Sequence, residues 1–180
     1  MLRSNPKILS ESVPFNMEAD SLNCIVMGDD VVPGMPEWDI FVKEIRKEMT
    51  LKAGQRCTGV RRIFVPENKM EDVWKAIAAS LSQTTIGNPM NEKVRMGSLA
   101  GEEQRSEVRS QVQKLLASSQ IVYGSLDSVE LIDADLKKGA FISPILLMND
   151  NPLASTAPHE VEAFGPVSTI MPYKNLDEAI

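Results

Sequence analysis

The sequence predicts an α/β fold in which helices cover a mainly parallel sheet. Short apolar runs typical of buried strands alternate along the chain with longer segments whose apolar residues recur at helical spacing. Such alternation is typical of parallel sheets, because a helix can carry the chain back to the start of the next strand. The 180 residues are 43% hydrophobic, which is enough to bury a proper core in one domain or two.

The first half of the chain is expected to contain two strands, each followed by a helix. An apolar run over residues 22–27 closes at a Gly-Asp-Asp turn and is expected to be a buried strand. After a proline-containing loop, a helix is expected to run up towards Gly54. Its apolar residues lie at helical spacing: Trp38, Phe41, Val42, Ile45 and Met49. A second strand over residues 62–65 stops at Pro66, and an amphipathic helix follows it. The apolar face of that helix consists of Met70, Val73, Trp74, Ile77 and Leu81.

The second half of the chain is expected to add three strands and one long helix. Residues 84–101 are rich in glycine, proline and asparagine and are expected to form an irregular connection. A third helix is expected over residues 102–118. Its apolar face comprises Val108, Val112, Leu115 and Leu116. Further strands are predicted at residues 121–123, 142–148 and 167–171.

The composition excludes several classes of protein. A net charge of −6 argues against a dedicated nucleic-acid surface, and no apolar run approaches the length of a membrane span. Only two cysteines are present, Cys24 and Cys57, and their dissimilar contexts predict a reducing cytoplasm rather than a disulfide scaffold. Metal ligation is not expected from one histidine and two unrelated cysteines. The sequence also lacks a glycine-rich phosphate-binding loop.

Cys57 is the candidate nucleophile. The stretch 52–58 reads Lys-Ala-Gly-Gln-Arg-Cys-Thr, in which the small and polar residues allow a sharp turn and the close approach of a substrate. Nearby positive charge favours the reactive thiolate. It is expected from Arg56, Arg61 and Arg62. The alternative is a buried cysteine that acts as a small hydrophobe, but the polar surroundings favour the nucleophile. Cys24, within an apolar strand, is expected to be inert.

Two acidic positions and one histidine are further candidates. Glu18, just ahead of the first strand, can act as a general base if burial raises its pKa, although a solvated loop residue is the alternative. Residues 162–167, Glu-Ala-Phe-Gly-Pro-Val, combine an acid, an aromatic ring and a turn, which suits a ribose hydroxyl and a flat ring. The alternative for this segment is an ordinary turn into a strand. No pattern ties His159, the only histidine, to Cys57, so a structural role is expected.

Taken in this order, the three segments resemble the aldehyde dehydrogenase superfamily. Residues 53–58 look like its catalytic-cysteine motif, and residues 162–167 look like its Glu-x-Phe-Gly-Pro-Val motif. Around Glu18 the family's usual Glu-Leu-Gly-Gly-Lys is replaced by Glu-Ala-Asp-Ser-Leu. That form resembles members that oxidise a CoA-linked semialdehyde in phenylacetic acid degradation, as one half of a bifunctional protein with a hydratase-like domain. Loss of the glycine pair is expected to restrict the movement of the glutamate side chain.

The resemblance implies a separate role for each candidate residue. Cys57 would attack the aldehyde, Glu18 would activate water to hydrolyse the thioester, Glu162 would hold the cofactor ribose, and Phe164 would position its ring. The implied cofactor is NADP or NAD, and the implied partner is a small-molecule aldehyde linked to CoA, in a homo-oligomeric parent protein. Two alternatives stay open. One is a CoA-acylating member of the family, and the other is an inert folding or interaction module.

The resemblance also implies that residues 1–180 are most of one catalytic domain. The family's Rossmann-like cofactor domain, and any hydratase-like domain, would lie outside this sequence. The final residues, 176–180, are typical of the opening of a helix, so we expect a chain cut from a longer protein. On its own, this chain is expected to be inactive as a dehydrogenase.

Overall fold

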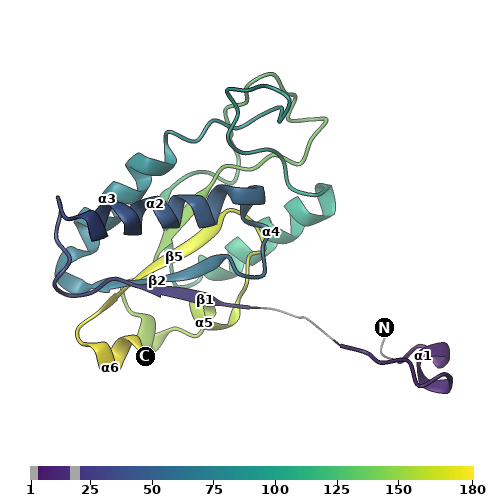
Figure 1. The fold of residues 1–180 in the computed structure, drawn as a ribbon, viewed down its shortest axis with the longest axis horizontal. Coiled ribbons are helices and arrows are strands. Elements are labelled where there is room, and N and C mark those ends of the chain that lie inside the picture. The colour runs from purple at the N-terminus through teal and green to yellow at the C-terminus, as the bar shows by residue number, and fades with distance from the viewer. Residues whose placement is uncertain (1–3, 17–20) are drawn as a thin grey trace.

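A computed structural model of the protein describes residues 4–16 and 21–180. The described residues form one five-stranded sheet with the strand order β1-β2-β5-β4-β3 (Figure 1). The strands are β1 (Asn23–Val26), β2 (Val60–Pro66), β3 (Gln120–Tyr123), β4 (Ile145–Met148) and β5 (Val167–Tyr173). Neighbouring strands run parallel except for β3 and β4, which pair antiparallel. The predicted α/β fold with a mainly parallel sheet is therefore confirmed.

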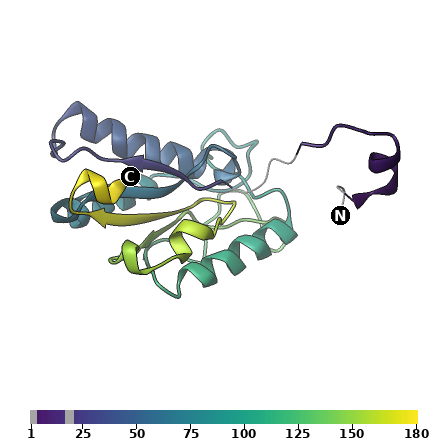
Figure 2. The same ribbon diagram turned by 90° about the horizontal axis from the view of Figure 1, so that it is seen from below.

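Helices cover both faces of this sheet (Figure 2). The covering helices are α2 (Pro36–Thr50) and α3 (Met70–Leu81) on one face, and α4 (Glu102–Leu115) and α5 (Ala157–Glu160) on the other. The helical spacing read from the sequence accounts for the face that α2 buries. Its buried residues are Trp38, Phe41, Val42, Ile45 and Met49. These side chains pack beneath the helix because every third or fourth residue returns to the same face.

The strands contribute side chains to both layers of the core. In β4, Leu146 packs in the core beneath α2 and α3, whereas Ile145 and Leu147 pack in the core beneath α4. Successive strand residues point to opposite faces, so a sheet covered on both sides needs continuous apolar runs. The apolar run in this part of the sequence meets that requirement.

Several short elements complete the described chain. They are α1 (Pro6–Ser10), η2 (Leu51–Gly54), η3 (Glu67–Lys69), η4 (Pro152–Ala154) and α6 (Leu176–Ala179). α1 has no buried residue and lies apart from the sheet in Figure 1. α6 confirms the helical start expected near the last residues, whereas α1 and α5 were not predicted, because one turn of helix is too short to show a period. None of the helices within residues 4–16 and 21–180 is both long and apolar enough to span a membrane.

The structure corrects three expectations from the sequence. The first strand is not buried: β1 lies at the edge of the sheet, and Asn23, Cys24 and Val26 are exposed. The strand expected from residue 142 begins only at Ile145, directly after a proline that has no N–H for the ladder. The helix expected to reach residue 118 ends at Leu115, and a turn follows it.

The topology brings the candidate segments to one edge of the sheet. Cys57 lies just before β2, and residues 162–166 lie just before β5. β2 and β5 are parallel neighbours, with Arg62 opposite Thr169. Because neighbouring parallel strands begin at the same edge, the two segments meet there.

Candidate active site

The chain turns sharply between α2 and Cys57. Lys52, Ala53 and Gly54 have φ angles of 54°, 51° and 68°, so three successive residues lie in the left-handed region. A Cβ atom added at Gly54 would lie 2.2 Å from the carbonyl oxygen of Gly165. Only glycine fits this backbone-to-backbone contact. The predicted sharp turn is therefore confirmed.

Cys57 follows this turn and is exposed. The hydroxyl of Ser21 and the side-chain amide of Asn23 both donate to the Cys57 carbonyl, the amide at 2.7 Å. The segment that leads into β1 therefore holds the backbone of the cysteine from one side. Exposure does not fit the alternative of a buried hydrophobic cysteine, and the role of nucleophile stays a prediction.

The three arginines near the cysteine are all engaged with other groups. Arg56 pairs with Glu48 at 2.8 Å, and Arg61 pairs with Glu162 at 3.5 Å. Arg62 donates to a backbone carbonyl at 2.9 Å. Acidic or carbonyl oxygens therefore accept hydrogen bonds from all three arginines, and their predicted effect on the Cys57 thiol stays a prediction.

Glu162 is held between Ser21, just before β1, and Arg61 in β2. Its side chain is 8% exposed. One carboxylate oxygen pairs with Arg61, and the other accepts from the backbone N–H of Ser21 at 3.1 Å. Burial lowers the pKa of the Arg61 guanidinium, and the adjacent Glu162 carboxylate opposes that effect. A buried, charge-paired carboxylate differs from the solvated side chain of an ordinary turn.

Phe164 is fixed from two directions. The Arg61 guanidinium lies over its ring, 5.6 Å from the centroid, and its carbonyl accepts from the side chain of Gln104 in α4 at 2.9 Å. The next residue, Gly165, packs so tightly that an added Cβ would lie 2.8 Å from the side chain of Val108. Helix α4 therefore sets the path of residues 164–165.

The sequence did not predict the partners of two polar residues of the site, Gln55 and Arg61. Gln55 accepts from the backbone N–H of Ala100 at 2.9 Å and donates to the carbonyl of Lys52 at 2.9 Å. Arg61, noted only as nearby positive charge, is the buried centre of the site. A signal existed for it, because it lies in phase with buried Ile63 in the alternation of a strand.

The remaining candidates have different outcomes. Glu18 lies outside the described residues, so its predicted role as base is untested. His159 donates from Nε2 to the Pro152 carbonyl at 3.1 Å, and its Nδ1 accepts from Arg62 at 3.4 Å. Its ring stacks on Phe64, with the two centroids 6.4 Å apart. These contacts agree with the structural role expected for this histidine.

Cys24 is exposed, which corrects the expectation that it lies in a buried strand. It lines a small hollow of about 150 Å³ together with Arg62 and His159. Among the described residues, no group of three or more histidine, cysteine, aspartate and glutamate side chains could hold a metal ion.

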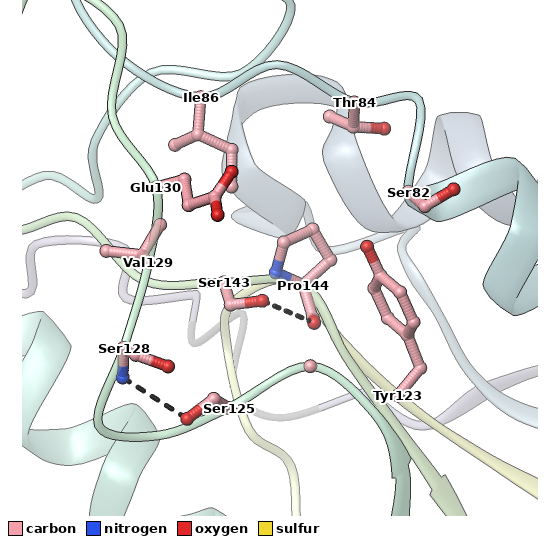
Figure 3. A pocket seen from close by; sticks show the side chains of 11 residues that line it. Ser82, Thr84, Ile86, Tyr123, Ser125, Ser128, Val129, Glu130, Ser143 and Pro144 are labelled. Atoms are coloured by element: carbon pink, nitrogen blue, oxygen red, sulfur yellow. Dashed lines mark hydrogen bonds between the residues drawn. The ribbon is translucent and has the colours of Figure 1, made fainter.

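A larger polar hollow of about 420 Å³ lies at the end of β3 (Figure 3). Glu130 points into it from one side, and the Tyr123 hydroxyl points into it from the other, towards Ser82 and Thr84. Burial raises the pKa of the Tyr123 hydroxyl. None of the residues that line this hollow comes from the Cys57 turn or from residues 162–166, so it does not belong to the candidate active site.

Comparisons with known proteins agree with this geometry. The family model described as "Aldehyde dehydrogenase family" matches residues 16–180. The chain is similar to a 3,4-dehydroadipyl-CoA semialdehyde dehydrogenase of Aromatoleum evansii, with 40% identity over 179 residues, 99% of this chain and 35% of that protein. A putative aldehyde dehydrogenase of Staphylococcus haemolyticus is 34% identical over 148 residues, 79% of this chain and 30% of that protein. The chain thus spans about a third of the length of these curated relatives.

Solved structures show the same fold. Aldehyde dehydrogenase 21 from Physcomitrella patens, in complex with the reaction product succinate, matches with a TM-score of 0.69 and 25% identity, over 89% of this chain and 30% of that one. An aldehyde dehydrogenase of Mycobacterium tuberculosis complexed with NAD+ matches with a TM-score of 0.74 and 24% identity, over 90% and 31% of the two chains.

Proposed function

The chain belongs to the aldehyde dehydrogenase family, and from this premise we propose that it carries the catalytic cysteine of an NAD(P)-dependent enzyme that oxidises an aldehyde to an acid. One observation carries the proposal. Exposed Cys57 follows a turn that packs directly against residues 162–166, so a nucleophile and a buried carboxylate share one edge of the sheet.

The cofactor contacts are proposed for Glu162 and Phe164. Each carboxylate oxygen of Glu162 accepts from one protein donor and keeps a second acceptor position for a ribose hydroxyl. The half-buried ring of Phe164 offers a flat face beside it. These residues fit a nicotinamide dinucleotide, which when bound supplies the hydride acceptor. Both NADP+ and NAD+ are compatible with these two contacts.

The covalent step is proposed for Cys57. Its thiolate adds to the aldehyde carbon, forming a C–S bond and leaving the former carbonyl oxygen as an oxyanion. The backbone N–H of Cys57 is the proposed oxyanion donor from this chain. Hydrogen bonds from Ser21 and Asn23 to the Cys57 carbonyl support this role, because they fix the backbone on which the sulfur and the N–H are carried.

Release of the acid is proposed for Glu18. Loss of hydride from the Cys57 adduct to a bound cofactor would leave a thioester on Cys57. As a general base, Glu18 takes a proton from water, whose oxygen adds to the thioester carbon and displaces the Cys57 thiolate. Ser21, which follows Glu18 by three residues in the sequence, contacts the Cys57 carbonyl and Glu162, and this supports the assignment. A CoA-acylating enzyme, which passes the acyl group to a thiol and can dispense with this base, is the alternative reaction.

The proposed substrate is a CoA-linked semialdehyde. The printed name of the Aromatoleum evansii relative supports this class. Phenylacetic acid degradation, with a hydratase-like partner domain, rests on the sequence around Glu18. Residues 1–180 are proposed to form most of a catalytic domain, with the cofactor domain on other sequence, and the short span relative to the matched proteins supports this. A homo-oligomeric state and a cytoplasmic location remain predictions.

The two cysteines provide a matched test of the proposed function. In the full-length enzyme, Cys57→Ser is expected to lower aldehyde-dependent cofactor reduction by several orders of magnitude, because the hydroxyl is a poor replacement for a thiolate. Cys24→Ser, at the other exposed cysteine, is expected to retain activity. Retained activity in Cys57→Ser would exclude the proposed mechanism. Inactivity of the wild-type enzyme with aldehydes and both cofactors would favour the inert module.

A further inference from the structure

Arg61 is a charged residue in a position that strands normally give to apolar side chains. It precedes Ile63 and Val65 on the same side of β2, and its side chain is 4% exposed. A buried guanidinium is unfavourable unless its N–H groups are paired. The partners of Arg61 therefore indicate why a cation is placed there.

Those partners come from two separate segments. From the Cys57 turn, the carbonyl of Gly54 accepts from Arg61 at 2.7 Å and the carbonyl of Arg56 at 3.4 Å. From the segment before β5, the carbonyl of Gly165 accepts at 2.7 Å, and the Glu162 carboxylate pairs at 3.5 Å. One planar group thus joins both segments.

The backbone contact between the segments brings two carbonyl oxygens within reach of Arg61. Gly54 and Gly165 approach so closely that there is no room for a Cβ at Gly54. Arg61 donates from two different nitrogens to the carbonyl oxygens of these two glycines. A guanidinium can serve both oxygens and a carboxylate in one plane, whereas a lysine ammonium is a single point charge.

We propose that Arg61 is a positioning residue. It holds the Cys57 turn against residues 162–166 and so fixes the position of the nucleophile relative to the ribose-binding carboxylate. The proposal rests on the proposed function for the roles of Cys57 and Glu162. Arg61 itself touches neither substrate nor the reacting atoms. It acts through the carbonyls of the turn, through the Glu162 carboxylate and through its position over the Phe164 ring.

The test compares Arg61→Lys with Arg62→Lys in the full-length enzyme. Arg62 is the matched control, because it is the next residue of the same strand and donates instead to the Leu22 carbonyl and His159. Hydrogen exchange, followed by mass spectrometry, is measured in residues 54–59 and 162–166 and, as a reference, in α3. Steady-state kinetics give KM for the cofactor and kcat separately.

Arg61→Lys is expected to speed amide exchange in both segments while α3 stays protected. It is also expected to raise the cofactor KM by about tenfold or more, with a smaller fall in kcat, because Glu162 is the proposed ribose contact and its displacement weakens cofactor binding directly. Arg62→Lys is expected to change neither. Equal acceleration of exchange in α3 would mean that Arg61 only stabilises the fold. An unchanged cofactor KM would equally overturn the positioning role.

A second variant covers the case in which Arg61→Lys does not fold. Glu162→Gln leaves the three carbonyl contacts of Arg61 in place, so the two segments are expected to stay protected while the cofactor KM rises. Loss of protection in this variant would show that Glu162, and not the carbonyl contacts, joins the segments, which would overturn the proposal. An inactive wild-type enzyme would refute the proposed function alone, since the exchange measurement still decides whether Arg61 joins the two segments.

Discussion

Cys57 and Cys24 are both exposed, but the regions around them are built differently. Cys57 follows a turn of three left-handed residues that packs against the segment before β5. Cys24 lies on the edge strand β1, opposite Arg62 in β2, beside a small hollow. Exposure therefore does not distinguish the two thiols. The two thiols differ instead in the number of distant segments that contact the backbone around each cysteine.

The charges around the two cysteines sharpen this comparison. Near Cys57, Arg61 is buried and joins two segments of the chain, whereas near Cys24, Arg62 is bonded to the Leu22 carbonyl and to His159. Both cysteines thus have an arginine nearby, and neither arginine is free of other partners. An arginine beside a cysteine is therefore a weak indicator of a reactive thiol.

After the Cys57→Ser test, the largest expected effect is at Glu18, the base proposed to act with Cys57, and His159 beside Cys24 is its control. Glu18→Gln in the full-length enzyme is expected to lower kcat by about 10²–10⁴, because the base is lost while the nucleophile stays. An initial burst of reduced cofactor should persist, since the block comes after hydride transfer. His159→Gln, beside Cys24, should keep nearly normal turnover. Wild-type turnover in Glu18→Gln, measured by rapid mixing and steady-state assays, would remove Glu18 from the mechanism.

A large effect on stability is expected at Gly54. Gly54→Ala is expected to lower the free energy of unfolding by roughly 3 kcal/mol or more, because it adds a clash with the Gly165 carbonyl to the strain of a positive φ. Gly34→Ala is the control, since Gly34 also has a positive φ but has open space around it, and about 1–2 kcal/mol is expected. Denaturant titration measures both values. Equal losses would mean that the close contact at the turn is relieved by a small shift.

A smaller effect is expected in the labelling of the two thiols. Iodoacetamide should modify Cys57 faster than Cys24 in the folded chain, by about tenfold if Cys57 is the more nucleophilic thiolate. Peptide mass mapping over time gives the two rates in one sample, so each thiol controls for the other. Because both residues are exposed, faster modification of Cys24 could not be explained by access and would count against the nucleophile assignment.

The smallest expected effect is the binding of cofactor by this chain alone. Glu162 and Phe164 offer one ribose contact and one ring contact, which cannot offset the roughly 4–15 kcal/mol needed to immobilise a dinucleotide. Calorimetry with NADP+ and NAD+ at millimolar concentration is therefore expected to give no saturable heat. The full-length enzyme is the positive control. Saturable binding by residues 1–180 would mean that the main cofactor site has been assigned to the wrong part of the protein.

The sequence alone determined the local elements and the segments of the candidate site. Apolar spacing located α2 and α3, because a helix returns a side chain to the same face every three or four residues. The small residues before Cys57 predicted a turn, since glycine tolerates positive φ. These features can be predicted from the sequence because they depend on residues that are close together in the chain. The paired motifs at Cys57 and Glu162 likewise indicated the family.

Only the tertiary structure decided which residues are buried and which groups are hydrogen-bonded to one another. An apolar run does not reveal whether its strand is central or at an edge, so the exposure of Cys24 depended on the strand order. The role of Arg61 also depended on Gly54 and Gly165, which are far apart in sequence and meet only when β2 and β5 lie side by side. Burial and hydrogen bonding depend on atoms brought together from distant parts of the chain, and local patterns do not encode them.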